Sequence, residues 1–152
     1  RSFVSVMSPE QIFRICNFAA LSGWLLLIFA GRARWAAGLV TGVLLPLIFA
    51  VLYVSLLAVH WGETPGGFST LSGVAALFSN RWLLLAGWIH YLAFDLFIGS
   101  WELRDARNNA IPHLLVIPCL ILTFLFGPAG LLLYFVIRRL RSRSFTLDRA
   151  QA

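Results

Sequence analysis

The sequence contains no lysine, only two cysteines and few charged residues of either sign. Of its 152 residues, 12% are charged and 60% are hydrophobic, whereas a typical soluble domain is about 25% charged and about 45–50% apolar. Too few polar side chains are present to cover a soluble globule, and two cysteines do not supply a disulfide framework. The composition also excludes disordered and collagen-like chains. We therefore expect a membrane protein.

All the basic side chains are arginines, and the formal net charge is +6. They lie at the edges of apolar runs and near the C-terminus, where arginines orient membrane proteins and contact anionic head groups. Basic and aromatic residues do not alternate, so we expect no nucleic-acid partner. Cys16 and Cys119 both fall inside apolar runs, where buried free thiols are usual. Their positions predict no metal site.

Four apolar runs are long enough to cross a bilayer, which takes about 20 residues per helix. Pro46 is expected to kink the second run, and Gly127-Pro128 to bend the long fourth one. Residues 68–78 have helical periodicity but are too few to cross. We predict an all-α polytopic membrane domain with a short interfacial helix between the second and third spans. The predicted domain covers residues 7–140, with spans at about 12–30, 35–59, 82–101 and 111–137.

The two ends of the chain and their arginines predict an orientation. Met7 is the sole methionine, so we interpret it as the natural start and residues 1–6 as a foreign or mis-assigned extension. Residues 141–152 form a basic tail. Four spans would place both ends on one side of the membrane. That side would hold most of the arginines, which favours cytoplasmic termini.

Asp95 is the sharpest candidate for chemistry, because it lies inside the third predicted span. A carboxylate at such a depth costs about 2.5–3.5 kcal/mol on insertion scales and normally faces a partner in the protein interior. An ion pair with Arg104 or Arg107 would explain it. The functional alternative is a general acid or base, or an anchor for a polar ligand group.

Two histidines could join Asp95 or act separately. His90 precedes Asp95 by five residues, which turns the two side chains about 140° apart on one helix. His113 falls in the first turn of the fourth span, at a different depth, so the pair is unsuited to ligating a haem. No nucleotide-binding or zinc-protease motif is present. We therefore expect no cofactor.

A stripe of aromatic residues follows His90 along the third span. Phe94, Phe97 and Trp101 share one helical face with it, either as ordinary membrane packing or as the wall of a groove for an isoprenoid lipid. The charged run that follows could be a structural charge network or the polar end of a site. We predict a cleft between the third and fourth spans that is open to the non-cytoplasmic side. Its polar end would comprise Asp95, Glu102, Arg104, Asp105 and His113, with Thr123 nearer its other end.

Three segments carry a family resemblance. They are HYLAFDLFIGSWELRDARNNAIPHLLVIPCLILTFLFGPAGLLLYFVIR at 90–138, FSTLSGVAALFSNRWLLLAGWIHY at 68–91 and FAALSGWLLLIFA at 18–30. Together they resemble the abscisic-acid-deficient-four-like membrane proteins, whose plant members take part in making the xanthophyll neoxanthin. The resemblance implies a role in carotenoid metabolism, with a carotenoid or other isoprenoid lipid as partner. Without lysine or a plastid transit peptide, the chain is expected in a bacterial inner membrane.

The chemistry that the resemblance implies is a redox-neutral isomerisation of an epoxy-carotenoid, by this protein or by an enzyme that it assists. An acid protonates the epoxide oxygen while a base removes a vinylic proton, which gives an allene and a tertiary alcohol without a cofactor. Carried onto this sequence, the catalytic candidates are Asp95, His90, Asp105 and His113. The ligand-binding candidates are Phe94, Phe97, Trp101, Glu102, Arg104 and Thr123.

A non-catalytic role is the alternative to this isomerase. The chain is small, and Gly38 and Gly42 lie on one helical face, where a second helix can approach closely. No catalytic nucleophile or metal-binding set is evident. Such a chain could bind a carotenoid or membrane lipids, or stabilise a larger photosynthetic or respiratory complex. Pigment that copurifies unaltered would favour this alternative.

Overall fold

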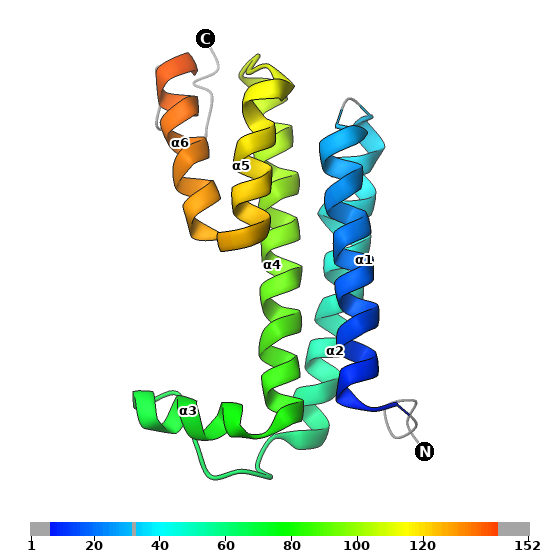
Figure 1. Ribbon diagram of the computed structural model, residues 1–152, viewed down its shortest axis with the longest axis vertical. Coiled ribbons are helices and arrows are strands. Elements are labelled where there is room, and N and C mark those ends of the chain that lie inside the picture. The colour runs from blue at the N-terminus through cyan, green and yellow to red at the C-terminus, as the bar shows by residue number, and fades with distance from the viewer. Residues whose placement is uncertain (1–6, 32, 143–152) are drawn as a thin grey trace. The chain divides into compact units, whose positions relative to one another are not determined.

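The computed structural model describes residues 7–31 and 33–142, and this part of the chain is all-α, as predicted (Figure 1). Predictions about residues 1–6, and about the tail beyond Ser142, fall outside the described residues. In chain order the helices are α1 (Pro9–Phe29), the π-helix η2 (Ala36–Leu44), α2 (Leu45–His60), α3 (Leu71–Ser79), α4 (Arg81–Asn108), α5 (His113–Phe126) and α6 (Pro128–Ser142).

Three helical stretches of the described chain are long and apolar enough to cross a membrane. They are Pro9–Phe29, Ala36–His60 and Arg81–Asn108. The prediction of a fourth span at about 111–137 is wrong, because that region forms two separate helices. α5 has 14 residues and α6 has 15, so each falls short of the length that a span requires.

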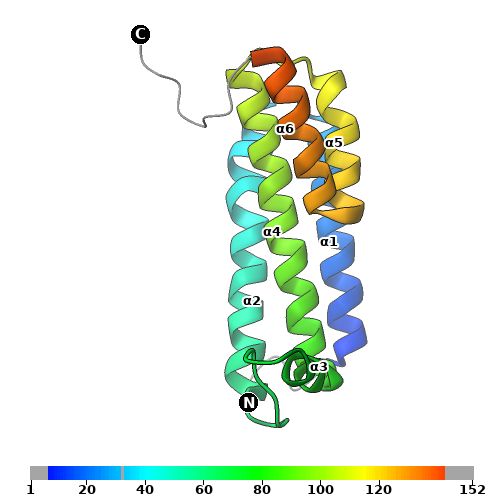
Figure 2. The ribbon, with the colours of Figure 1, turned by 90° about the vertical axis from the view of Figure 1, so that its left-hand side faces the viewer.

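The break between α5 and α6 lies at Gly127. This residue has a φ of +41°, a conformation that glycine adopts without steric cost. Its N–H donates to the Thr123 carbonyl at 2.8 Å and closes the last turn of α5. Pro128 then begins α6, where the missing N–H leaves no helical hydrogen bond unmade. The chain therefore reverses into an antiparallel helical hairpin instead of continuing as one kinked span (Figures 1 and 2).

The chain divides into two compact units, and α1 and α4 contribute to both. The first unit comprises Arg1–Ser22 and Leu44–Phe94, and the second comprises Gly23–Val43 and Asp95–Ala152. In the first unit, α3 runs crosswise to the start of α4 (Figure 1). Thr70 caps α3 by accepting a hydrogen bond from the Gly73 N–H at 3.0 Å. The predicted short helix is thus present, and its place at a membrane interface stays a prediction.

α4 is longer than the predicted third span, because the charged run after Trp101 remains helical to Asn108. Glu102 and Asp105 of this run are buried in the second unit, together with apolar neighbours on the same helix. Because these polar groups find partners within the second unit, the helix continues through residues 102–108, which we expected to form a connection. It ends where Ala110 adopts a φ of 54° and the Ile111 N–H donates to the Ala106 carbonyl at 2.8 Å.

The expected distortion near Pro46 takes the form of a π-helix upstream of it. Pro46 lies in the first turn of α2 and has no N–H to donate into η2. In η2 the Thr41 hydroxyl donates to the Ala36 carbonyl, five residues earlier, at 3.0 Å. Gly42 lies against Ser100 of α4, whereas Gly38 faces open space. Only one of the two glycines therefore permits the close helix approach that we predicted.

Cysteine labelling is expected to place Glu63 on one side of the membrane and both Asn108 and Arg141 on the other. Of the three candidate spans, only Arg81–Asn108 lies between Glu63 and the end of α4, so residues 63 and 108 should lie on opposite sides. The α5–α6 hairpin then returns to the side on which it starts. The prediction of two termini on one side depended on four spans and loses its premise. The measurement uses single-cysteine variants, made after Cys16→Ala and Cys119→Ala, and a membrane-impermeant maleimide. Labelling of positions 63 and 141 from the same side would restore the four-span topology.

Candidate functional site

Three carboxyl groups follow one face of α4 in the second unit. Asp95 and Glu102 are two turns apart, and Asp105 lies one turn beyond Glu102. All three were candidate site residues, and each meets a different part of the α5–α6 hairpin. The residues that they meet are Gly127 at its turn, Thr123 on α5, and Tyr134 and Arg138 on α6.

Asp105 is held by two donors from α6. The Tyr134 hydroxyl and the Arg138 Nε each donate to Asp105 Oδ2 at 2.6 Å. The Asp105 side chain is 10% exposed and that of Arg138 is 3% exposed, so water screens this ion pair little. Trp101 packs edge-on against Tyr134, with ring centroids 5.6 Å apart. The carboxylate is therefore fully engaged, and its position suits a structural or positioning role.

Glu102 is fully buried and has a single described partner. The Thr123 hydroxyl lies 3.0 Å from Oε1 and 3.2 Å from Oε2 of its carboxyl group. One hydroxyl proton can satisfy only one of these oxygens at a time. Among residues 7–31 and 33–142, no cation forms a salt bridge with Glu102. Capacity for a further hydrogen bond therefore remains at this carboxyl group.

Asp95 lies beside the turn of the hairpin. A Cβ atom built on Gly127 would come within 3.0 Å of Asp95 Oδ1 and 3.2 Å of Oδ2. Glycine thus suits this position through its φ, and a larger residue would also press against the Asp95 carboxyl group. The expected ion pair of Asp95 with Arg104 or Arg107 stays a prediction. Arg107 donates to the Gly31 and Ala33 carbonyls, and the buried Arg104 Nε has no hydrogen-bond partner.

His113 packs against the end of α1. Its Nε2 donates to the Ile28 carbonyl at 2.8 Å, and the ring occupies the space that Gly31 leaves open. The last carbonyls of a helix lack partners within it. His113 and Arg107 together satisfy three of these or adjoining carbonyls. This arrangement gives His113 a structural role as a cap at the end of α1, and its catalytic role stays a prediction.

His90 and Phe94 belong to the first unit and the carboxyl groups to the second. The His90 ring stacks on Phe94, with centroids 4.7 Å apart, and meets the Tyr53 ring edge-on at 5.5 Å. His90 and Tyr53 line a pocket of about 270 Å³ whose walls include Trp61 and Phe78. Phe94 and Phe97 are 59% and 42% exposed, so the predicted aromatic stripe presents much of its surface outward.

In the first unit a polar cluster links the loop between α2 and α3 to the residue that precedes α4. Glu63 accepts hydrogen bonds from His60 at 2.9 Å and from Asn80 at 3.1 Å, and these interactions hold the pKa of the Glu63 carboxyl below its usual value. His60 also stacks on Trp82, with ring centroids 4.7 Å apart. This carboxylate is exposed and lies outside the helices of spanning length. Glu63 therefore serves as an exposed control position for substitutions of the α4 carboxyl groups.

Sequence reasoning missed Tyr134 and Arg138, the two residues that hold Asp105. Neither was among the candidate site residues, because Tyr134 falls inside the fourth predicted span and Arg138 among the arginines near the C-terminus. Their spacing of four residues on an apolar helix places both polar ends on one face. That spacing was the available signal. It becomes informative only once α6 is known to run back along α4.

The α4 site can perform acid–base chemistry with groups of its own chain. Two carboxyl groups on one face, at Asp95 and Glu102, could give and take a proton at a ligand bound between them. Among the described residues no group of three His, Cys, Asp or Glu side chains could hold a metal ion. The two described pockets lie in the first unit and are lined by other residues.

Comparison with known proteins identifies the family of the chain. The sequence profile described as ABA DEFICIENT 4-like matches residues 11–134. The curated "Protein ABA DEFICIENT 4, chloroplastic" of Arabidopsis thaliana is 29% identical over 146 residues, which cover 90% of this chain and 64% of that protein. This chain thus spans a little under two thirds of its relative's length. No solved structure matches. The predicted resemblance is confirmed, and the chain belongs to the ABA DEFICIENT 4-like family.

Proposed function

We propose that the chain acts in carotenoid metabolism, as a cofactor-free isomerase of an epoxy-carotenoid. The supporting observation is that Asp95 and Glu102 share one face of α4 in a member of this family. A carotenoid-related role follows from the family resemblance and suits a chain with three helices of spanning length. Such helices keep a long apolar substrate and the reacting groups in one environment.

The proposed reaction needs one acid and one base and conserves all atoms. One carboxyl group donates a proton to the epoxide oxygen as the carbon–oxygen bond breaks. The other removes a proton from the neighbouring vinylic carbon. The electron pair of the broken carbon–hydrogen bond then forms the second double bond of the allene. We assign these two roles to Asp95 and Glu102. Asp105, which Tyr134 and Arg138 already engage, is assigned a positioning role.

Asp95→Asn and Glu102→Gln are each expected to lower pigment conversion by at least about 100-fold, the usual contribution of a general acid or base. The measurement is the ratio of allenic product to epoxide in a bacterial strain that makes the epoxy-carotenoid and expresses each variant. Glu63→Gln is the matched control, because it makes the same carboxyl-to-amide change at an exposed site in the other unit. It should convert pigment like the wild type.

The amount of folded protein, measured by fluorescence-detected gel filtration, separates catalysis from stability. Loss of conversion at an unchanged amount of folded protein supports the assignment. Loss of folded protein in proportion to conversion would make Asp95 or Glu102 a structural residue. Full conversion by both variants would contradict the proposed site.

A pigment-binding subunit is the second candidate function, and the aromatic pocket around His90 favours it. The pocket of about 270 Å³ presents Tyr53, Trp61 and Phe78, whose rings can pack on a conjugated end group. In this case carotenoid should copurify chemically unchanged. Tyr53→Ala should then lower the bound pigment several-fold while Glu102→Gln leaves it unaltered. For an isomerase, in contrast, Glu102→Gln should lower the amount of product, and Tyr53→Ala should leave it unaltered.

A further inference from the structure

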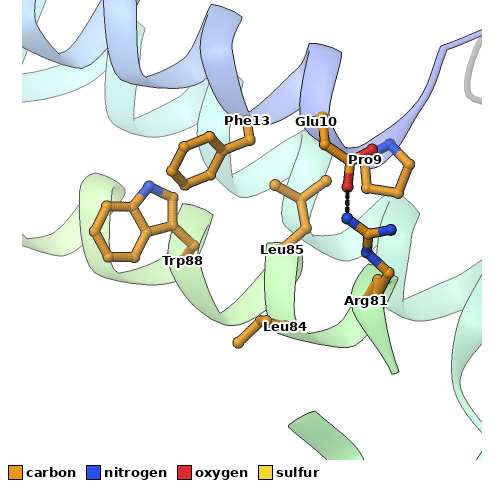
Figure 3. A pocket seen from close by; sticks show the side chains of 7 residues that line it. All are labelled: Pro9, Glu10, Phe13, Arg81, Leu84, Leu85 and Trp88. Carbon is orange, nitrogen blue, oxygen red and sulfur yellow. Dashed lines mark hydrogen bonds and ion pairs between the residues drawn. The ribbon is translucent and has the colours of Figure 1, made fainter. Parts of the chain in front are cut away.

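A second groove lies in the first unit, between the starts of α1 and α4, with a volume of about 340 Å³ (Figure 3). It is lined by residues that neither the α4 carboxyl site nor the aromatic pocket uses. One end is charged and the remainder is apolar. Because both helices are long enough to span a membrane, their first turns would lie near the level of lipid head groups.

The charged end of the groove consists of Glu10 and Arg81, which form an ion pair between α1 and α4. The pair uses one nitrogen, Nη2, and one oxygen, Oε1. Arg81 keeps further N–H donors, and Glu10 keeps a second oxygen. Their side chains are 73% and 50% exposed, so these groups are accessible. The groove therefore offers one cation and one anion side by side.

The apolar part of the groove is formed by Phe13, Leu84, Leu85 and Trp88. Trp88 lies two turns after Arg81, which is about 10 Å along the helix at 1.5 Å per residue. Its indole N–H donates to Asn17 Oδ1 at 2.7 Å, and its ring packs on Phe13 with centroids 5.5 Å apart. These two contacts hold the ring in place, and it forms a wall of the groove at the end away from Glu10 and Arg81 (Figure 3).

We propose that this groove binds a phospholipid whose head group carries a primary ammonium, such as phosphatidylethanolamine. The phosphate accepts hydrogen bonds from Arg81, and the ammonium donates to Glu10. One acyl chain lies against Phe13, Leu84 and Trp88. The neighbouring opposite charges of the protein match the neighbouring opposite charges of a zwitterionic head. An anionic head would meet the Glu10 carboxylate, and a choline head has no N–H to donate.

The test is native mass spectrometry of the purified full chain with equal amounts of phosphatidylethanolamine, phosphatidylcholine and phosphatidylglycerol of identical acyl chains. The wild type should retain at least about fivefold more of the ethanolamine lipid than of either other lipid. Glu10→Gln should lower ethanolamine-lipid binding to the level of the choline lipid, which stays unchanged. Arg81→Gln should lower binding of all three lipids, because each carries a phosphate.

Two further variants distinguish recognition from simple loss of the ion pair. Leu84→Trp fills the groove without altering its charges, and Leu84 is 52% exposed, so the larger side chain can be accommodated. It should abolish binding of all three lipids, whereas Glu63→Gln should change none. Equal retention of the three lipids, no retained lipid, or an ethanolamine preference that survives Glu10→Gln would overturn the proposal. Identical effects of Glu10→Gln and Arg81→Gln on every lipid would also overturn it.

Discussion

Gly130→Ala is expected to destabilise the protein by about 1–3 kcal/mol or more, the usual cost of overpacking. A Cβ atom at position 130 would lie 2.1 Å from both the backbone nitrogen and the Oγ1 of Thr123, and 2.5 Å from its Cα. Backbone atoms cannot rotate away as a flexible side chain can. The two helices of the hairpin would have to separate, and the Thr123 hydroxyl would move from Glu102.

The matched control is Gly38→Ala, which makes the same chemical change where no atom lies within 4 Å of the added Cβ. Replacing a helical glycine by alanine removes conformational freedom from the unfolded chain, so this variant should be unchanged or up to about 1 kcal/mol more stable. The measurement is the midpoint of thermal unfolding of both variants in the same detergent. Equal midpoints would contradict the close α5–α6 contact.

Arg138→Met is expected to cost about 3–5 kcal/mol, because it leaves the Asp105 carboxylate buried without its cation. Methionine keeps much of the length of the arginine side chain, so packing changes little. Arg141→Met on the same helix is the control, since Arg141 is exposed and an exposed charge contributes at most about 1 kcal/mol. Denaturant unfolding of the purified variants measures both differences.

A double-mutant cycle then shows whether the cost arises at Asp105. Adding Asp105→Asn to Arg138→Met removes the buried charge, so the double variant should recover part of the lost stability. The Tyr134 hydroxyl can still donate to the amide oxygen. If the two single substitutions simply add, the ion pair between α4 and α6 does not contribute as the geometry implies.

The all-α class and the three long apolar helices could be predicted from hydrophobic run lengths, since a span has a nearly fixed number of residues. The fourth run illustrates the limit of that argument. Its length alone favours a span, whereas the positive φ of Gly127 and the start of a helix at Pro128 favour a reversal. In the sequence, Gly127 and Pro128 already indicate an interruption of the fourth helical run. Whether a break bends or reverses a helix depends on what the second half packs against.

The candidate site could be predicted in part for the same reason. Asp95, Glu102 and Asp105 share a face of one helix, which follows from helical periodicity alone. The partners of Glu102 and Asp105 are 21 or more residues away in sequence, on α5 and α6. Sequence reasoning therefore located the acids and Thr123 but could not find Tyr134 or Arg138. A pairing of those residues with Asp105 requires the hairpin, which the four-span prediction lacked.

The most direct test of the proposed function uses the purified chain alone in liposomes that contain an epoxy-carotenoid, with no added cofactor. Mass spectrometry and nuclear magnetic resonance of the extracted pigment then follow the reaction. We predict a product of unchanged mass that contains an allene, formed by the wild type and by Glu63→Gln but not by Glu102→Gln. Pigment that is bound to folded wild-type protein yet remains an unaltered epoxide would contradict the isomerase and support a pigment-binding subunit.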